Sequence, residues 1–198
     1  MDLFMSTMTQ TQQLTQLKKE YMEMFECEQN GQSKFRLIHG DKKYYGNCAL
    51  LILPYVTEHG FLNAEHEKTN LMKTLEHYKI TNYMITYAQL NKSSSSSKKL
   101  IKQSRPLMTK LIEIINPKLI IVFDESSSLL FMTQKPNITE QHGTMITTYF
   151  NIPVLLTYNL DYYNKRTGYE DKTYKNNIFF NDWLTISTQY KELIYANI

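Results

Sequence analysis

Aromatic rings and cations alternate in one short stretch, and this pattern is the strongest chemical signal in the sequence. The residues concerned are Tyr162, Tyr163, Lys165, Arg166 and Tyr169. Aromatic side chains stack on unpaired bases in a sequence-tolerant way, and the cations beside them contact the phosphate backbone. The stretch therefore predicts an interaction with nucleic acid.

A second group of cations surrounds a run of five serines, Ser93–Ser97. Its five members fall within 14 residues: Lys92, Lys98, Lys99, Lys102 and Arg105. We expect residues 91–104 to form a mobile loop whose cations contact phosphates along a DNA backbone. The alternative is an ordinary solvated linker, because lysines beside serine runs are common in linkers.

Composition argues against several other kinds of site. Cys27 and Cys48 are the only cysteines, which excludes a four-cysteine metal or cluster site. We expect both to be free thiols in a reducing compartment, with a single disulfide as the alternative. Four histidines lack metal-ligand spacing and are interpreted as surface or core residues: His59, His66, His77 and His142. We therefore expect no metal and no cofactor, and the net charge of +3 is too small to predict DNA binding by itself.

The elements that must position these residues follow the pattern of an α/β protein. Leu119–Phe123 is a run of five apolar residues without alternation, as expected for a strand that is buried on both faces. The strands predicted for the central sheet are Ala49–Leu53, Ile80–Tyr87, Leu119–Phe123 and Ile152–Tyr158, and Phe35–Ile38, Asp41–Tyr45 and Met145–Tyr149 are predicted to be short extended or strand segments. Because helical patterns separate these runs, we expect a three-layer sandwich in which helices flank a central, mostly parallel sheet.

The chain predicts one domain with a short leading segment. Residues 1–16 are polar and rich in Gln and Thr, which indicates a flexible segment or a frayed helix start. Residues 17–198 then form a single domain, whose first helix runs to about Cys27. No apolar stretch is long enough to span a membrane and no signal peptide is evident. We expect an intracellular protein of the cytoplasm, the nucleus or a viral replication site.

Two local features predict where a strand ends and where a helix begins. Pro54 is expected to end the first buried strand, because proline has no N–H to donate to a sheet. Asp124 or Ser126 is expected to cap an α-helix that follows Leu119–Phe123.

Three segments, taken in order, resemble the uracil-DNA glycosylase superfamily, and most closely the branch whose thermophilic members carry an iron–sulfur cluster. Lys79–Tyr87 resembles the strand of that branch that begins with Ile-Thr-Asn. Ile112–Phe131 resembles its helix, Pro-Lys turn, strand and following helix, and Asn151–Arg166 resembles its strand ending in Thr-Tyr-His-Pro. The resemblance spans residues 48–195 approximately, and it implies a uracil-DNA glycosylase-like α/β fold that contacts DNA.

The resemblance also implies a base pocket. Phe61 matches the ring that stacks on a flipped base, and Asn82 matches the asparagine that hydrogen-bonds the uracil edge. Asn159 stands where the family has the histidine that stabilises charge on the departing base. The alternatives are ordinary packing for Phe61, backbone hydrogen bonding for Asn82 and turn formation for Asn159. The resemblance further places the loop after Asn159 and the basic connection against DNA.

Both chemical motifs of that family are altered in this chain. Leu53–Thr57 replaces the glycine-rich turn that positions the hydrolytic water, and Glu58 is interpreted as a solvated loop residue. Asn159 and Leu160 replace the His-Pro pair, and the cluster cysteines are absent. We therefore expect no catalytic residue, and a protein that binds single- or double-stranded DNA, a polymerase or other replication or repair partner, or both. Its many Tyr, Lys, Asn and Ile residues fit a viral or phage accessory factor. The alternative is an active glycosylase that removes uracil or a related base by hydrolysis.

Overall fold

The computed structural model describes residues 8–24, 37–56, 65–92, 96–146, 148, 151–159 and 169–196. Within these ranges, six strands form one mixed sheet in the order β1-β3-β2-β4-β6-β5. The strands are β1 (His39–Gly40), β2 (Ala49–Val56), β3 (Tyr83–Lys92), β4 (Leu119–Phe123), β5 (Met145–Ile146) and β6 (Val154–Thr157). β2, β3, β4 and β6 run parallel, whereas the edge strands β1 and β5 are antiparallel to their neighbours.

β4 has the predicted bounds and the predicted burial. All five of its residues are completely inaccessible to solvent, as its unbroken apolar sequence requires. It pairs with β2 on one side and β6 on the other, so it lies inside the parallel part of the sheet. The prediction of an α/β fold with a mostly parallel sheet and flanking helices is thus confirmed.

The neighbouring strands differ from the prediction at their ends. β2 continues through Pro54 to Val56, so the proline does not end the strand. Its pairing with β4 stops at Ile52, and Pro54 therefore lies where β2 is no longer paired on both sides. A missing N–H is tolerated at such a place. β3 begins at Tyr83 and continues to Lys92, several residues later than predicted at both ends.

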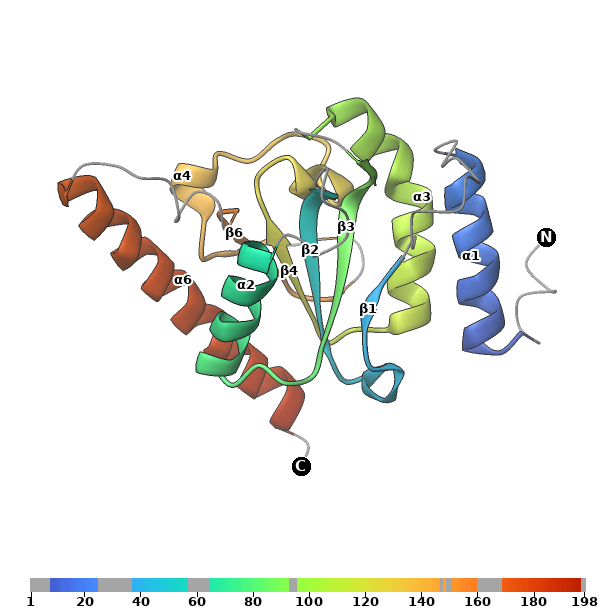
Figure 1. The fold of residues 1–198 in the computed structure, drawn as a ribbon, viewed down its shortest axis with the longest axis horizontal. Coiled ribbons are helices and arrows are strands. Elements are labelled where there is room, and N and C mark those ends of the chain that lie inside the picture. Colours follow the sequence, from blue (N-terminus) through green and yellow to red (C-terminus); the bar gives the residue numbers. More distant parts are fainter. Residues whose placement is uncertain are drawn as a thin grey trace.

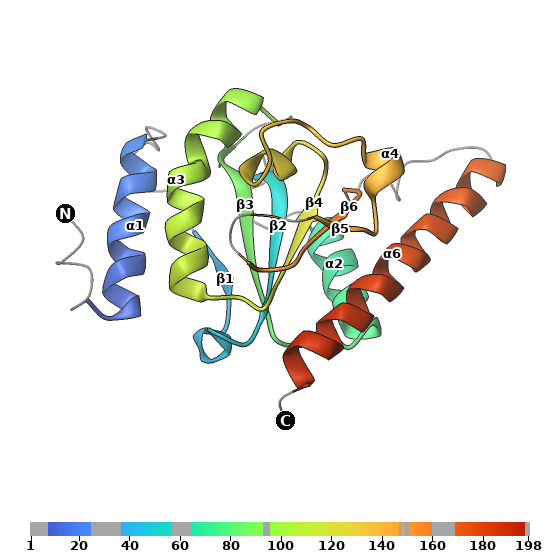
Figure 2. The ribbon, with the colours of Figure 1, turned by 180° about the vertical axis from the view of Figure 1, so that it is seen from behind.

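Helices cover the sheet on two sides (Figure 1). The long helices are α1 (Gln10–Met24), α2 (Glu65–His77), α3 (Lys98–Ile115) and α6 (Tyr169–Tyr195). α2 and α6 lie on one side, and α3 lies on the other with α1 outside it (Figures 1 and 2). Trp183 of α6 is fully buried between Phe123 and Tyr78, with ring centroids 6.1 Å and 5.7 Å away. This aromatic contact joins α6 to the sheet and to the end of α2.

Two helices begin earlier than the sequence predicts. α3 starts at Lys98, so the expectation that residues 91–104 form a mobile loop is wrong for Lys98–Ser104. Ser97 caps the helix by accepting from the backbone N–H of Leu100, and buried Ser104 donates to the carbonyl of Ala88. α1 starts at Gln10, which makes the end of the expected flexible segment 1–16 helical.

The segment after β4 is a short 3-10 helix, η3 (Ser127–Leu130), where an α-helix was expected. Ser126 is its N-cap residue but makes no side-chain capping bond. The remaining short helices are η2 (Lys42–Tyr44) and α4 (Ile138–Gln141). Leu129 and Leu130 are buried, so this segment packs against the core.

Cys48 is a buried free thiol, and burial raises its pKa to about 12. Cys27 lies outside the described residues. Across the described ranges, none of the helices combines the length and apolar character that crossing a membrane requires.

Candidate functional site

The chain reverses its direction of travel across the sheet at β2, which defines one candidate site. From β2 it passes through α2 to β3, and from β3 through α3 to β4 on the other side of β2. Open α/β sheets bind ligands in the crevice outside the carboxyl ends of strands at such a switch point. We call the side where β2, β3, β4 and β6 end the carboxyl edge, and the opposite side the amino edge.

Asp124 lies at the carboxyl edge, directly after β4, in a strained conformation. Its φ is +84°, a region that costs a non-glycine residue about 1 kcal/mol or more. Its backbone N–H donates to the carbonyl of Thr157 at 2.9 Å. Burial raises the pKa of this carboxyl above its ordinary value. Strain and a perturbed pKa at a switch point are typical of a ligand site.

Asp124→Asn should make the protein more stable at neutral pH. The folded state raises the pKa of Asp124, so it holds the proton more tightly than the unfolded chain does. The resulting penalty grows as the pH rises through the interval between the two pKa values, and it is absent below the unfolded value. Asparagine tolerates the positive φ without a buried charge. Chemical denaturation across pH should show a stability gain that disappears in acid, and a constant difference at every pH would contradict the burial effect.

A second polar group lies one strand away and is connected to Asp124 through Thr157. His142 Nδ1 lies 2.7 Å from Asp182 Oδ1, and the hydroxyl of Thr157 donates to Asp182 Oδ2 at 2.9 Å. The carboxylate is 2% exposed and the histidine side chain 22% exposed. A buried carboxylate is costly unless donors satisfy it, and here two other elements supply them.

The turn that carries His142 is shaped by the next residue. Gly143 has a φ of +68°, and a Cβ there would come within 2.7 Å of Asp182 Oδ1. Glycine is therefore required both for the backbone conformation and for the close approach to the carboxylate. Asn159 follows β6 at the same edge and is partly buried. The described carboxyl edge thus holds Asp124, the His142–Asp182 pair and Asn159.

Three lysines form a basic cluster at the start of α3, which also lies at this edge (Figure 1). Lys98, Lys99 and Lys102 are all exposed, and the first turn of the helix contains no acidic residue. The buried Gln89 of β3 accepts from the backbone N–H of Ser97 at 2.8 Å, which fixes the start of the helix against the sheet. Because a helix N-terminus is itself positive, the cluster and the helix together form a concentrated positive region.

Arg105 differs from these lysines. Its Nε donates to the carbonyl of Leu129 at 2.5 Å, and its Nη2 donates to the carbonyl of Met132. The guanidinium therefore joins α3 to the segment after β4, and its donors are directed at the protein. We assign Arg105 a structural role, in place of the predicted contact with DNA.

The structure does not bring together Asn82 and Asn159, the two predicted base-pocket residues that it describes. Asn82 precedes β3 at the amino edge, where the Tyr190 hydroxyl accepts from its backbone N–H at 2.8 Å. The strand registers place Asn82 and Asn159 roughly 20 Å apart along the strand direction, at about 3.3 Å per residue. The other predicted site residues lie outside the described part of the chain: Phe61, Tyr162, Tyr163, Lys165, Arg166 and the side chain of Lys92.

Sequence reasoning missed Asp124, His142 and Asp182 as site residues. Asp124 had a usable signal, since it is a carboxylate directly after the most apolar run in the chain. His142 and Asp182 are 40 residues apart and share no motif, so only the fold reveals that they form a pair.

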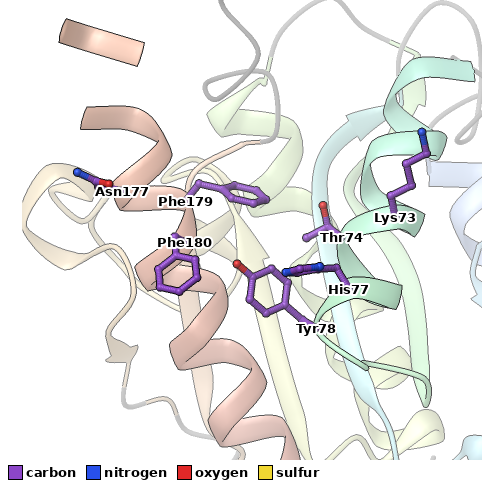
Figure 3. A pocket seen from close by; sticks show the side chains of 7 residues that line it. All are labelled: Lys73, Thr74, His77, Tyr78, Asn177, Phe179 and Phe180. Carbon is purple, nitrogen blue, oxygen red and sulfur yellow. The ribbon is translucent and has the colours of Figure 1, made fainter. Parts of the chain in front are cut away.

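A shallow pocket of about 530 Å³ lies between α2 and α6 (Figure 3). Its lining residues are Lys73, Thr74, His77, Tyr78, Asn177, Phe179 and Phe180. Beside it, Phe180 and Leu184 are 53% and 50% exposed and follow one another on a face of α6. This apolar pair forms a second candidate surface, suited to contact with another protein.

Within the described ranges, no group of three or more histidine, cysteine, aspartate or glutamate side chains could hold a metal ion. In comparisons with known proteins, the chain matches no protein-family model and no curated protein.

Proposed function

We propose that this protein binds DNA along the carboxyl edge of its sheet without excising bases. The observation that carries this proposal is the cluster Lys98, Lys99 and Lys102 at the positive end of α3. Lys98 and Lys99 lie in the first turn of α3, where a cation opposes the helix dipole. The cluster therefore does not serve helix stability, whereas a phosphate backbone would neutralise both the lysines and the helix end.

The arrangement favours binding over catalysis. Asn82 lies at the amino edge, far from Asn159, so the two amides do not cooperate on one base. The resemblance to uracil-DNA glycosylases supports a DNA-facing carboxyl edge, while Asn159 replaces the residue that would stabilise the leaving base. The loss of such stabilisation alone slows enzymes by roughly 10²–10³. An active glycosylase remains the alternative reading of the same resemblance.

Fluorescence anisotropy with single- and double-stranded oligonucleotides tests this proposal. We expect affinity to fall steeply with salt and to depend little on sequence, because phosphates provide most of the contacts. Uracil-containing oligonucleotides should be bound without abasic sites appearing. Rapid uracil release that Asn159→Ala abolishes would establish the glycosylase alternative, and salt-independent or undetectable binding would reject DNA as the ligand.

A protein partner is the second candidate, and the exposed Phe180 and Leu184 of α6 favour it. Two large apolar side chains one turn apart suit contact with an apolar groove or helix of another protein. A replication or repair protein, in a viral or phage setting, is the partner that accords with DNA binding at the carboxyl edge.

A further inference from the structure

His142 is held in one orientation by its partners. Asp182 is 2% exposed, and its two carboxylate oxygens lie 2.7 Å from His142 Nδ1 and 2.9 Å from the Thr157 hydroxyl. A carboxylate that is ionised only accepts hydrogen bonds, and in that state of Asp182 the hydrogen of this contact is on Nδ1. The ring is thereby fixed with Nε2 on the side away from Asp182.

Nε2 is the atom that this arrangement leaves available. No described residue hydrogen-bonds it, although the side chain is only 22% exposed and the ring of Tyr158 lies beside it, with centroids 5.1 Å apart. A contact that only joined α6 to the turn after α4 would need Nδ1 and nothing more. The ordered Nε2 is positioned for a ligand.

The position of His142 places that ligand on the DNA-facing edge. The backbone N–H of Gly143 donates to the carbonyl of Leu156, so His142 lies level with the end of β6. Figure 1 shows α4, which precedes His142, at the same end of the molecule as the start of α3. Four strand spacings separate β3 from β5, which corresponds to about 19 Å across the edge.

We infer that His142 binds a DNA backbone phosphate as an imidazolium held between Asp182 and that phosphate. This inference rests on the proposed function, which it extends by a second contact at the far end of the binding edge. In the complex Nδ1 donates to Asp182 and Nε2 donates to a phosphodiester oxygen, the proton on Nε2 coming from solvent. The titratable side chains in contact with His142 within the described ranges are Asp182 of α6 and Tyr158 after β6, and Glu140 lies two residues before it on α4. Binding therefore takes up a proton.

The spacing also defines a minimum length of DNA. A DNA strand that follows the carboxyl edge from β3 to β5 must cover about 19 Å, which is about six nucleotides at roughly 3.4 Å each. Oligonucleotides shorter than this should bind the lysines without engaging His142.

His142→Asn separates a ligand contact from a structural one. The asparagine amide can replace Nδ1 as the donor to Asp182, but it has nothing in the place of Nε2. His77→Asn is the matched control, because His77 is exposed at the end of α2 on the amino edge. Calorimetry in two buffers of different ionisation enthalpy measures the proton uptake that accompanies DNA binding. The ligands are single strands of about 12 and about 4 nucleotides, one longer and one shorter than the span of about six nucleotides.

We expect the wild type and His77→Asn to take up protons with the long strand, and affinity to rise as the pH falls. His142→Asn should lose the uptake and bind the long strand roughly three- to tenfold more weakly, as expected for one hydrogen bond of ordinary strength. The short strand and a nucleoside monophosphate should show no difference between the variants. The melting temperature of His142→Asn should stay near that of the wild type.

Unchanged affinity and proton uptake in His142→Asn would overturn the inference and leave DNA binding by the lysines intact. Equally weakened binding of long and short strands by His142→Asn would show that the His142–Asp182 pair is structural, and so would weaker binding that accompanies a lower melting temperature. Either result would also overturn the inference. If replacement of Lys98, Lys99 and Lys102 with glutamine does not change DNA binding, the proposed function itself is rejected.

Discussion

Replacing Lys98, Lys99 and Lys102 together with glutamine is expected to weaken DNA binding roughly ten- to a hundredfold at low salt, as the loss of up to three phosphate contacts requires. Glutamine keeps much of each side chain's length but removes the charge. The triple variant should melt at the same temperature as the wild type or higher, because the lysines oppose the dipole of α3. Fluorescence anisotropy and thermal unfolding of the same samples measure both quantities.

The amino edge supplies a matched control for this variant. Lys42, Lys79 and Lys118 are exposed and precede β2, β3 and β4 respectively. Their replacement with glutamine removes the same charge from the opposite edge of the sheet. We expect this control to bind DNA nearly as well as the wild type. Equal weakening in both triple variants would show that net charge, and not the carboxyl edge, determines affinity.

Arg105→Gln should destabilise the protein by about 2–3 kcal/mol, the cost of losing charged donors to two carbonyls that are then left unsatisfied. The carbonyls are those of Leu129 and Met132, which the guanidinium ties to α3. For a chain of this size we expect a fall in melting temperature of about 4–10 °C. Lys102→Gln, one turn earlier and exposed, should leave stability unchanged or improved.

The same pair of variants distinguishes structure from binding. Below its melting temperature, Arg105→Gln should bind DNA with nearly wild-type affinity, whereas Lys102→Gln should bind more weakly. If Arg105→Gln has normal stability but has lost DNA affinity, Arg105 contacts DNA as the sequence predicts.

The fold could be predicted where local pattern and burial agree. Leu119–Phe123 has no polar residue to place in solvent, so its position inside a parallel sheet followed directly from its composition. The start of α3 was missed because a serine run and several lysines suggested a loop, and because Pro106 suggested a helix start. The structure accommodates Pro106 inside the helix, on its exposed side.

The site was less predictable because its parts meet only in three dimensions. Asn82 was assigned to a base pocket on the letters Ile-Thr-Asn, yet β3 begins one residue later and Asn82 falls at the amino edge. His142 and Asp182 come from separate elements, and no periodicity relates them. The sequence shows that the lysines form a charged group. That they lie at the N-terminus of a helix, and not in a loop, became evident only from the structure.

The salt dependence of DNA affinity in the two triple variants tests the location of the DNA most directly. The logarithm of the binding constant falls with the logarithm of salt by about 0.7 per phosphate contact for single strands and about 0.9 for duplexes. If DNA lies along the carboxyl edge, the slope of the Lys98, Lys99 and Lys102 variant should be shallower than wild type by about 2–3, as three lost contacts require. The slope of the Lys42, Lys79 and Lys118 variant should match that of the wild type. A wild-type slope in the first variant, or a shallower slope in the second alone, would contradict DNA binding at the carboxyl edge.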